Sequence, residues 1–149
     1  KRIIQQLINK CETPLLIFLD TDTEILERLP MDVLTYLDSK DFCTIKRRMG
    51  CTDICSYQGS GVVDSGIMSY NLQRNGADVA KYWYNYYKNG GAFEEVIWAD
   101  HYILTSVIKH LEGGLDIGGL DAEWGAPFGH INNYIAHHRG AQYEDRDYR

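Results

Sequence analysis

The spacing of apolar residues at the start of the chain predicts a helix that leads into a strand. Within residues 1–10, isoleucine and leucine recur on one helical face, and Pro14 disfavours helix at the residue before it. Residues 15–19 (LLIFL) then form an unbroken apolar run closed by polar residues, which is typical of a strand covered on both faces. A helix followed by such a central strand predicts an α/β fold, with helices on the faces of a single mixed sheet.

The rest of the chain alternates between helical spacing, short apolar runs and polar stretches. The predicted helices cover residues 32–37, 78–88 and 94–111. A strand is predicted for residues 42–46, and two short strands around a serine–glycine turn are predicted for residues 61–71. Residues 46–60 and roughly the last thirty residues are polar and contain glycine, so we expect irregular structure there.

Composition places the chain among globular proteins. Its 149 residues, 44% hydrophobic and 24% charged, indicate one folded domain over residues 1–149 rather than a disordered chain. The 15 basic and 21 acidic side chains give a net charge of −6, which argues against a nucleic-acid surface built on bulk charge. No window approaches ~18 uninterrupted apolar residues, so we expect no membrane span. The four cysteines are too few and too unevenly spaced for a disulfide scaffold, which favours reduced thiols and a cytoplasmic protein.

Two carboxylates directly after the first apolar run give the sharpest chemical signal. Asp20 and Asp22, with one residue between them, can converge on one divalent cation where the strand turns outward. Mg²⁺ and Mn²⁺ favour carboxylate oxygens and commonly share the phosphate oxygens of a substrate. Ligands also tend to bind at the ends of strands in α/β sheets. The alternative is a solvated turn in which Asp22 or Thr23 caps a following helix.

Residues 16–22 (LIFLDTD) carry a resemblance to two enzyme families. They resemble the strand and D-x-D motif of GT-A-fold glycosyltransferases, in which the pair holds Mn²⁺ or Mg²⁺ against the diphosphate of a nucleotide sugar. They equally match the D-x-D-x-T pattern of haloacid-dehalogenase-type phosphatases, with Asp20 as nucleophile, Asp22 as acid/base and Thr23 in the third position. This motif alone does not choose between the two families.

Three later segments resemble the glycosyltransferases, in the expected order. They are residues 64–71 (DSGIMSYN), residues 95–102 (EVIWADHY) and residues 137–140 (HHRG). The phosphatases instead need a later lysine and a closing acidic pair near a strand end. Here Lys109 falls in a helical pattern, and Asp116 and Asp121 fall in a glycine-rich loop. The order of the segments therefore favours a GT-A-like fold, of which the chain resembles the C-terminal portion.

The resemblance implies a hexosyltransferase-like enzyme that moves a sugar from a nucleotide-diphosphate donor to an unidentified acceptor. It implies that Asp20, Asp22 and His137 hold Mn²⁺ or Mg²⁺, and that Arg139 and Gly140 help to hold the diphosphate. The N-terminal nucleotide-binding half of the family is missing apart from its last helix, so we expect the domain to be incomplete at its N-terminus. A non-catalytic binding or structural module with a glycosyltransferase-like core is the alternative.

The resemblance also implies residues that act on the sugar and the acceptor. Asp100 would orient the sugar or the acceptor hydroxyl, and would be the base if the reaction inverts configuration. Asp64 is the second candidate for that catalytic role. The expected contacts to the sugar or the acceptor come from Ser65, Gly66, Trp98, His101 and Trp124.

Overall fold

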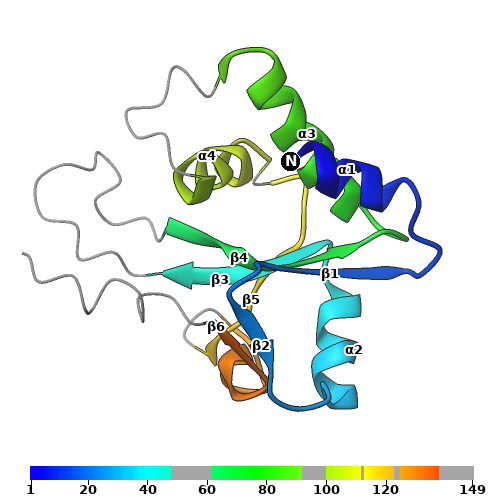
Figure 1. Cartoon of the computed structure of the whole chain (residues 1–149), viewed down its shortest axis with the longest axis vertical. Coiled ribbons are helices and arrows are strands. Elements are labelled where there is room, and N and C mark those ends of the chain that lie inside the picture. Colours follow the sequence, from blue (N-terminus) through cyan, green and yellow to red (C-terminus); the bar gives the residue numbers. More distant parts are fainter. Residues whose placement is uncertain (48–61, 92–99, 112, 123–124, 138–149) are drawn as a thin grey trace, which may run out of the picture.

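The computed structural model describes residues 1–47, 62–91, 100–111, 113–122 and 125–137 (Figure 1). The fold is α/β, with helices on both faces of a mixed four-stranded sheet, as the sequence predicts. A separate two-stranded sheet is also present, which the prediction of a single sheet did not include. The larger sheet has the strand order β1-β4-β3-β5, and β2 pairs with β6. The elements are α1 (Arg2–Ile8), β1 (Leu15–Leu19), β2 (Thr23–Ile25), α2 (Met31–Ser39), β3 (Phe42–Arg47), β4 (Val62–Asn71), α3 (Gly76–Lys88), α4 (Asp100–Leu111), β5 (Ile117–Gly119), the 3-10 helix η3 (Ile131–Asn133) and β6 (Ile135–His137).

The direction of the strands decides which loops share an edge of the sheet. β4 runs antiparallel to both β1 and β3, and β5 runs parallel to β3. β1, β3 and β5 therefore point the same way. Their C-terminal ends lie along one edge of the sheet, meaning the side at which these strands end and not the side formed by an outermost strand. Asp20, the residue after β1, lies at this edge, whereas Asp41, the residue before β3, lies at the opposite one.

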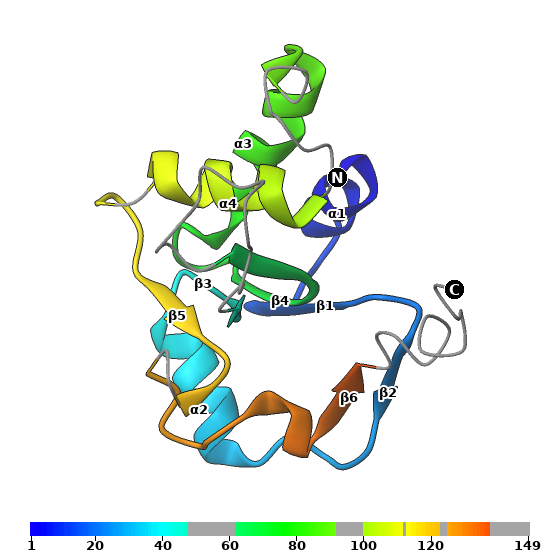
Figure 2. The same cartoon turned by 90° about the vertical axis from the view of Figure 1, so that its left-hand side faces the viewer.

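Two hydrophobic clusters, one on each face, hold the helices to the sheet (Figure 2). One lies beneath α1, α3 and α4, and its largest fully buried side chains are Trp83, Tyr70 and Phe42. The other lies against α2 and the C-terminal segment, and it includes Leu37 and Ile135. No helix among the described residues is long and apolar enough to cross a membrane.

The prediction for β1 is right about its faces and wrong about its place. Leu16 and Phe18 pack against one cluster, and Leu15, Ile17 and Leu19 pack against the other. However, β1 is an edge strand of the four-stranded sheet, and all five of its residues are only partly buried. An unbroken apolar run indicates that both faces of a strand are covered, but it does not indicate whether other strands pair with it on one side or on both.

The prediction of two short strands around a serine–glycine turn is also wrong, because residues 62–71 form one continuous strand. The register with β3 nevertheless shifts in this segment. Thr44 pairs with Met68 and Lys46 pairs with Val63, so two steps along β3 correspond to five along β4. Ser65 and Gly66 lie within this irregularity, which interrupts the pairing with β3 inside one strand and is not a turn between two strands.

The other elements agree in type and differ in extent. α2 and α3 are slightly longer than the predicted helices, and β3 extends one residue further. The described part of the long helix begins at Asp100, and the predicted residues 94–99 lie outside the described residues. The C-terminal stretch is not wholly irregular, because it contains β5, η3 and β6. Three-residue elements are too short to give a periodic signal.

A glycine at the start of α3 generates a stability prediction. A Cβ on Gly76 would collide with the main-chain carbonyl of Asp41 and lie 2.5 Å from the amide nitrogen of Asn71. Because these are backbone atoms, they cannot move aside cheaply. We expect Gly76→Ala to lower the free energy of unfolding by about 1–3 kcal/mol in a denaturant titration. Gly114→Ala is the matched control, since the nearest atom to its Cβ would be 3.7 Å away; equal losses in both variants would contradict this account.

Candidate functional site

The two D-x-D carboxylates lie on a closed turn at the C-terminal edge of the sheet. The amide of Asp20 donates to the carbonyl of Gly66 at 2.8 Å, which extends the β1–β4 ladder to the first carboxylate. The carbonyl of Asp20 then accepts from both the amide (3.1 Å) and the hydroxyl (2.6 Å) of Thr23. Asp20 is half-buried and Asp22 is exposed. The helix-cap alternative is wrong, because the strand β2 follows the turn instead of a helix.

The two-stranded sheet brings the C-terminal histidine to this turn. β2 and β6 pair antiparallel, with Thr23 opposite His137 and Ile25 opposite Ile135. The carbonyl of Tyr134 accepts hydrogen bonds from the amides of the two residues directly after β2, Leu26 and Glu27, and Ile135 is buried against the core beneath the sheet. The backbone of His137 therefore lies opposite the residue that directly follows Asp22, as Figure 2 shows for β2 and β6. The side chain of His137 lies outside the described part of the structure.

The irregular part of β4 lies beside the same turn. Gly66 is buried and receives the Asp20 hydrogen bond through its carbonyl, and Ser65 is half-buried next to it. Asp64 precedes them in the strand, although its side chain is not among those described. The structure thus brings the backbone of Asp64, Ser65 and Gly66 to the Asp20 end of β1.

The helix α4 covers β4 near this point, and Asp100 is its first residue. The amide of Val63 in β4 donates to the hydroxyl of Thr105 in α4 at 3.0 Å, so this helix is anchored to the strand close to the irregular segment. In Figure 2, α4 lies across the strands with its beginning on the side of β1. The side chains of Asp100 and His101 are not described. Trp98, Trp124, Arg139 and Gly140 lie outside the described residues altogether.

The donors at the turn fit a hard divalent cation that is shared with a phosphate. Among the described side chains, no group of three His, Cys, Asp or Glu residues could hold a metal by itself. Mg²⁺ is usually bound through only one or two protein carboxylates together with substrate phosphates, rather than in a complete protein cage. Asp20 and Asp22 supply such a pair, so their chemistry suits Mg²⁺ or Mn²⁺ in the presence of a diphosphate.

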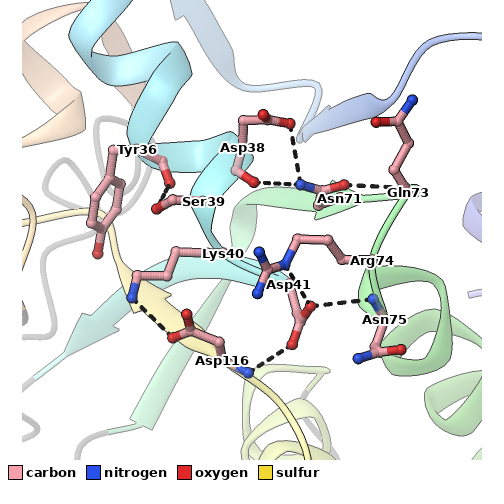
Figure 3. Close-up of polar contacts among 10 residues, drawn as sticks. All are labelled: Tyr36, Asp38, Ser39, Lys40, Asp41, Asn71, Gln73, Arg74, Asn75 and Asp116. Carbon is pink, nitrogen blue, oxygen red and sulfur yellow. Dashed lines mark hydrogen bonds and ion pairs between the residues drawn. The ribbon is translucent and has the colours of Figure 1, made fainter.

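The opposite edge of the sheet holds a second acidic cluster with a different character (Figure 3). Asp41 is buried, and its carboxylate accepts from Arg74 Nε (3.0 Å), the amide of Asn75 (3.2 Å) and the amide of Asp116 (2.7 Å). Burial by itself raises the pKa of the Asp41 carboxyl. The donors outweigh this effect, so the pKa lies below its ordinary value of 3.8.

Neighbouring contacts show that this cluster joins five elements. The side-chain amide of Asn71 at the end of β4 donates to the carbonyl of Asp38 in α2 at 2.6 Å. Lys40 forms an ion pair with Asp116, before β5, at 2.9 Å. A buried carboxylate with a shifted pKa is often a functional residue. Here all the hydrogen bonds to the Asp41 carboxylate are donated by Arg74, Asn75 and Asp116, and they connect the turns before β3, α3 and β5. We therefore assign a structural role to Asp41.

Comparisons with known proteins add no assignment: no protein-family model matches the chain, and no curated protein matches it in sequence. The site therefore rests on its own geometry.

The structure gives two residues a role that the sequence analysis did not assign to them. Thr23, named there only as the third position of the D-x-D-x-T pattern or as a helix cap, closes the turn; the D-x-x-T spacing suggests this role, since a threonine hydroxyl commonly bonds a nearby backbone carbonyl. Asp41 was missed altogether, and the sequence carries no signal for it. Its donors come from residues more than thirty positions away.

The lowered pKa of Asp41 gives a pH-dependent prediction. Because the folded-state pKa lies below the ordinary value, the ionised carboxylate contributes stability that is complete above about pH 4 and is lost as the pH falls through the folded-state pKa. We expect Asp41→Asn to lower the free energy of unfolding by about 2 kcal/mol at neutral pH. The difference from the wild type should shrink below about pH 4, as measured by urea titrations across pH.

Asp116→Asn is the matched control. It keeps the backbone donor to Asp41 and removes only the partly exposed ion pair with Lys40, which is worth little. A loss in Asp41→Asn that stays constant from neutral to acid pH would show that Asp41 does not act as a buried anion.

Proposed function

We propose that this chain is a metal-dependent glycosyltransferase domain that moves a sugar from a nucleotide-diphosphate donor to an acceptor. The observation that supports it most is the pairing of β2 with β6. The D-x-D motif and the C-terminal histidine segment are far apart in the sequence, and each separately resembles a segment of the glycosyltransferases. Their meeting, with Thr23 opposite His137, is what a shared cation and diphosphate site requires.

In this proposal Asp20, Asp22 and His137 hold Mn²⁺ or Mg²⁺. When bound, the cation neutralises the charge that builds up on the departing diphosphate. Arg139 and Gly140 follow His137 in the chain and would bind the diphosphate through charge-assisted and backbone hydrogen bonds. In this proposal the diphosphate binds near the edge of the sheet where β1 ends, beside Asp20 and Asp22.

Asp100 and Asp64 are the proposed groups at the reacting sugar. Asp100 begins the helix that covers β4, and Asp64 lies in the irregular segment of that strand, so both belong to elements beside the turn. Asp100 would orient the sugar or the acceptor hydroxyl and would take its proton in an inverting reaction. Ser65, Gly66, Trp98, His101 and Trp124 are proposed to line the sugar and the acceptor.

The placement of the later acids favours a transferase over a phosphatase. A phosphatase of the haloacid-dehalogenase type would need a lysine and two acids near the Asp20 edge. Asp116 instead precedes β5, at the opposite edge, where its amide bonds to Asp41. Lys109 is an exposed residue in the last turn of α4. Of the three, only Asp121 follows the C-terminal end of β5.

Metal and diphosphate should bind together. We expect Mn²⁺ with a nucleoside diphosphate to raise the melting temperature more than the sum of the two separate effects, because each ligand binds the folded state and shares the other's site. At about 100 times its dissociation constant a ligand stabilises the folded state by about 2.7 kcal/mol. Asp22→Asn should abolish this synergy while the apo protein melts normally, since Asp22 is exposed.

Asp78→Asn is the control for charge alone, because Asp78 is an exposed acid in the first turn of α3. Synergy that survives in Asp22→Asn, or disappears equally in Asp78→Asn, would remove the D-x-D turn from the proposed site.

The histidine opposite the turn should contribute to metal affinity. We expect His137→Ala to weaken Mn²⁺ binding by about tenfold or more in a calorimetric titration, because an imidazole donor is removed. His110→Ala is the matched control, since His110 is an exposed residue at the end of α4 and stacks on Tyr82. Equal effects of the two substitutions would show that His137 is not a ligand.

A further inference from the structure

One carbonyl at the D-x-D turn accepts two hydrogen bonds from a single residue. The hydroxyl of Thr23 donates to the Asp20 carbonyl at 2.6 Å, and the amide of Thr23 donates to the same oxygen at 3.1 Å. The hydrogen bond from the Thr23 amide would by itself close the four-residue turn, as in an ordinary β-turn. The hydroxyl adds a second, short bond, which fixes the side chain of Thr23 as well as its backbone.

The same residue joins the turn to the C-terminal strand. Thr23 is the first residue of β2 and lies opposite His137 in the register with β6. Asp20 is bound to Thr23 through hydrogen bonds, Asp22 through a peptide bond, and His137 through the strand pairing. All three proposed metal ligands are therefore positioned relative to one residue that is not itself a ligand.

We propose that Thr23 is a positioning residue, which holds the Asp20 and Asp22 carboxylates and the backbone of His137 in the arrangement that binds the cation. This inference rests on the proposed function. Two side chains that must be ordered on binding cost conformational entropy, and a turn already closed in the apo protein reduces that cost. The contribution of the hydroxyl is therefore larger in metal affinity than in folding.

The contacts explain why folding depends less on this hydroxyl. Thr23 is half-buried, and without its hydroxyl the Asp20 carbonyl still accepts the Thr23 amide. No buried acceptor is left without a donor, so the large penalty for an unsatisfied polar group does not arise. Valine has nearly the shape of threonine and is favoured in strands, so Thr23→Val removes the hydrogen bond and keeps β2.

The test compares Mn²⁺ affinity in three variants of the chain. Thr23→Val should weaken binding of Mn²⁺, added together with a nucleoside diphosphate, by about tenfold in calorimetry or in a paramagnetic-resonance titration, and Thr23→Ser should restore most of it. Thr35→Val is the matched control, because the Thr35 hydroxyl makes a similar bond to the Met31 carbonyl (2.8 Å) inside α2, away from the turn. Melting temperatures of Thr23→Val and Thr35→Val should change by similar small amounts.

The outcomes separate this inference from the proposed function. If the wild type binds Mn²⁺, Asp22→Asn loses it and Thr23→Val keeps it, Thr23 is not a positioning residue and the proposed function stands. If Thr23→Val loses affinity only in proportion to its unfolded fraction, its role is structural and the inference is overturned. If the wild type binds no Mn²⁺, the proposed function fails and this inference fails with it.

Discussion

Two antiparallel ladders meet on β4: β1 is hydrogen-bonded along one of its sides and β3 along the other. Both faces of this strand are buried. Met68 and Tyr70 lie in the cluster beneath α1, α3 and α4, and Ile67 lies in the cluster against α2. The position of Asp20 is fixed by the continuation of the first ladder to the Gly66 carbonyl. The position of the candidate site therefore depends on β4. The register shift around Ser65 and Gly66 lies beside the turn that carries Asp20 and Asp22.

The two edges of the sheet use acidic residues for different purposes. At one edge Asp41 is buried, and its charge is balanced by backbone amides and an arginine, because an uncompensated buried carboxylate would be too costly. At the other edge Asp22 is exposed on a turn that is closed by hydrogen bonds from the backbone amide and the hydroxyl of Thr23. The two edges therefore differ in burial: Asp41 is enclosed by its structural donors, whereas Asp22 is accessible from solvent.

Local patterns were sufficient for the longer elements and insufficient for their arrangement. Helical spacing predicted α2 and α3, and the apolar run predicted β1, because these signals depend on residues within a few positions. The same run did not reveal that β1 is an edge strand, since lateral neighbours are set by pairings with residues about fifty positions away. The Ser65–Gly66 pair resembles a turn locally, but β4 continues through it, since the strand pairs with β3 both before and after this pair and with β1 from Ile67 onward.

For the candidate site, the sequence identified the residues and the structure supplied their proximity. Asp20 and Asp22 are separated by one residue, so the sequence alone places both on the same turn. The approach of His137 depends on a three-residue strand pairing, which no periodicity reveals. The sequence identified Thr23 only as part of a motif. Its positioning role depends on the hydrogen bonds to Asp20 and on its place opposite His137, which only the structure shows.

The proposed cation site is formed by the Asp20–Thr23 turn and the strand opposite it. Paramagnetic broadening of amide signals by Mn²⁺, which falls steeply with distance, tests this directly in the full chain. The account predicts that the amides of Asp20, Asp22 and His137 broaden first, while those of Asp41 and Asn75 at the other edge stay sharp. Broadening centred on the Asp41 cluster, or no localised broadening at all, would contradict it.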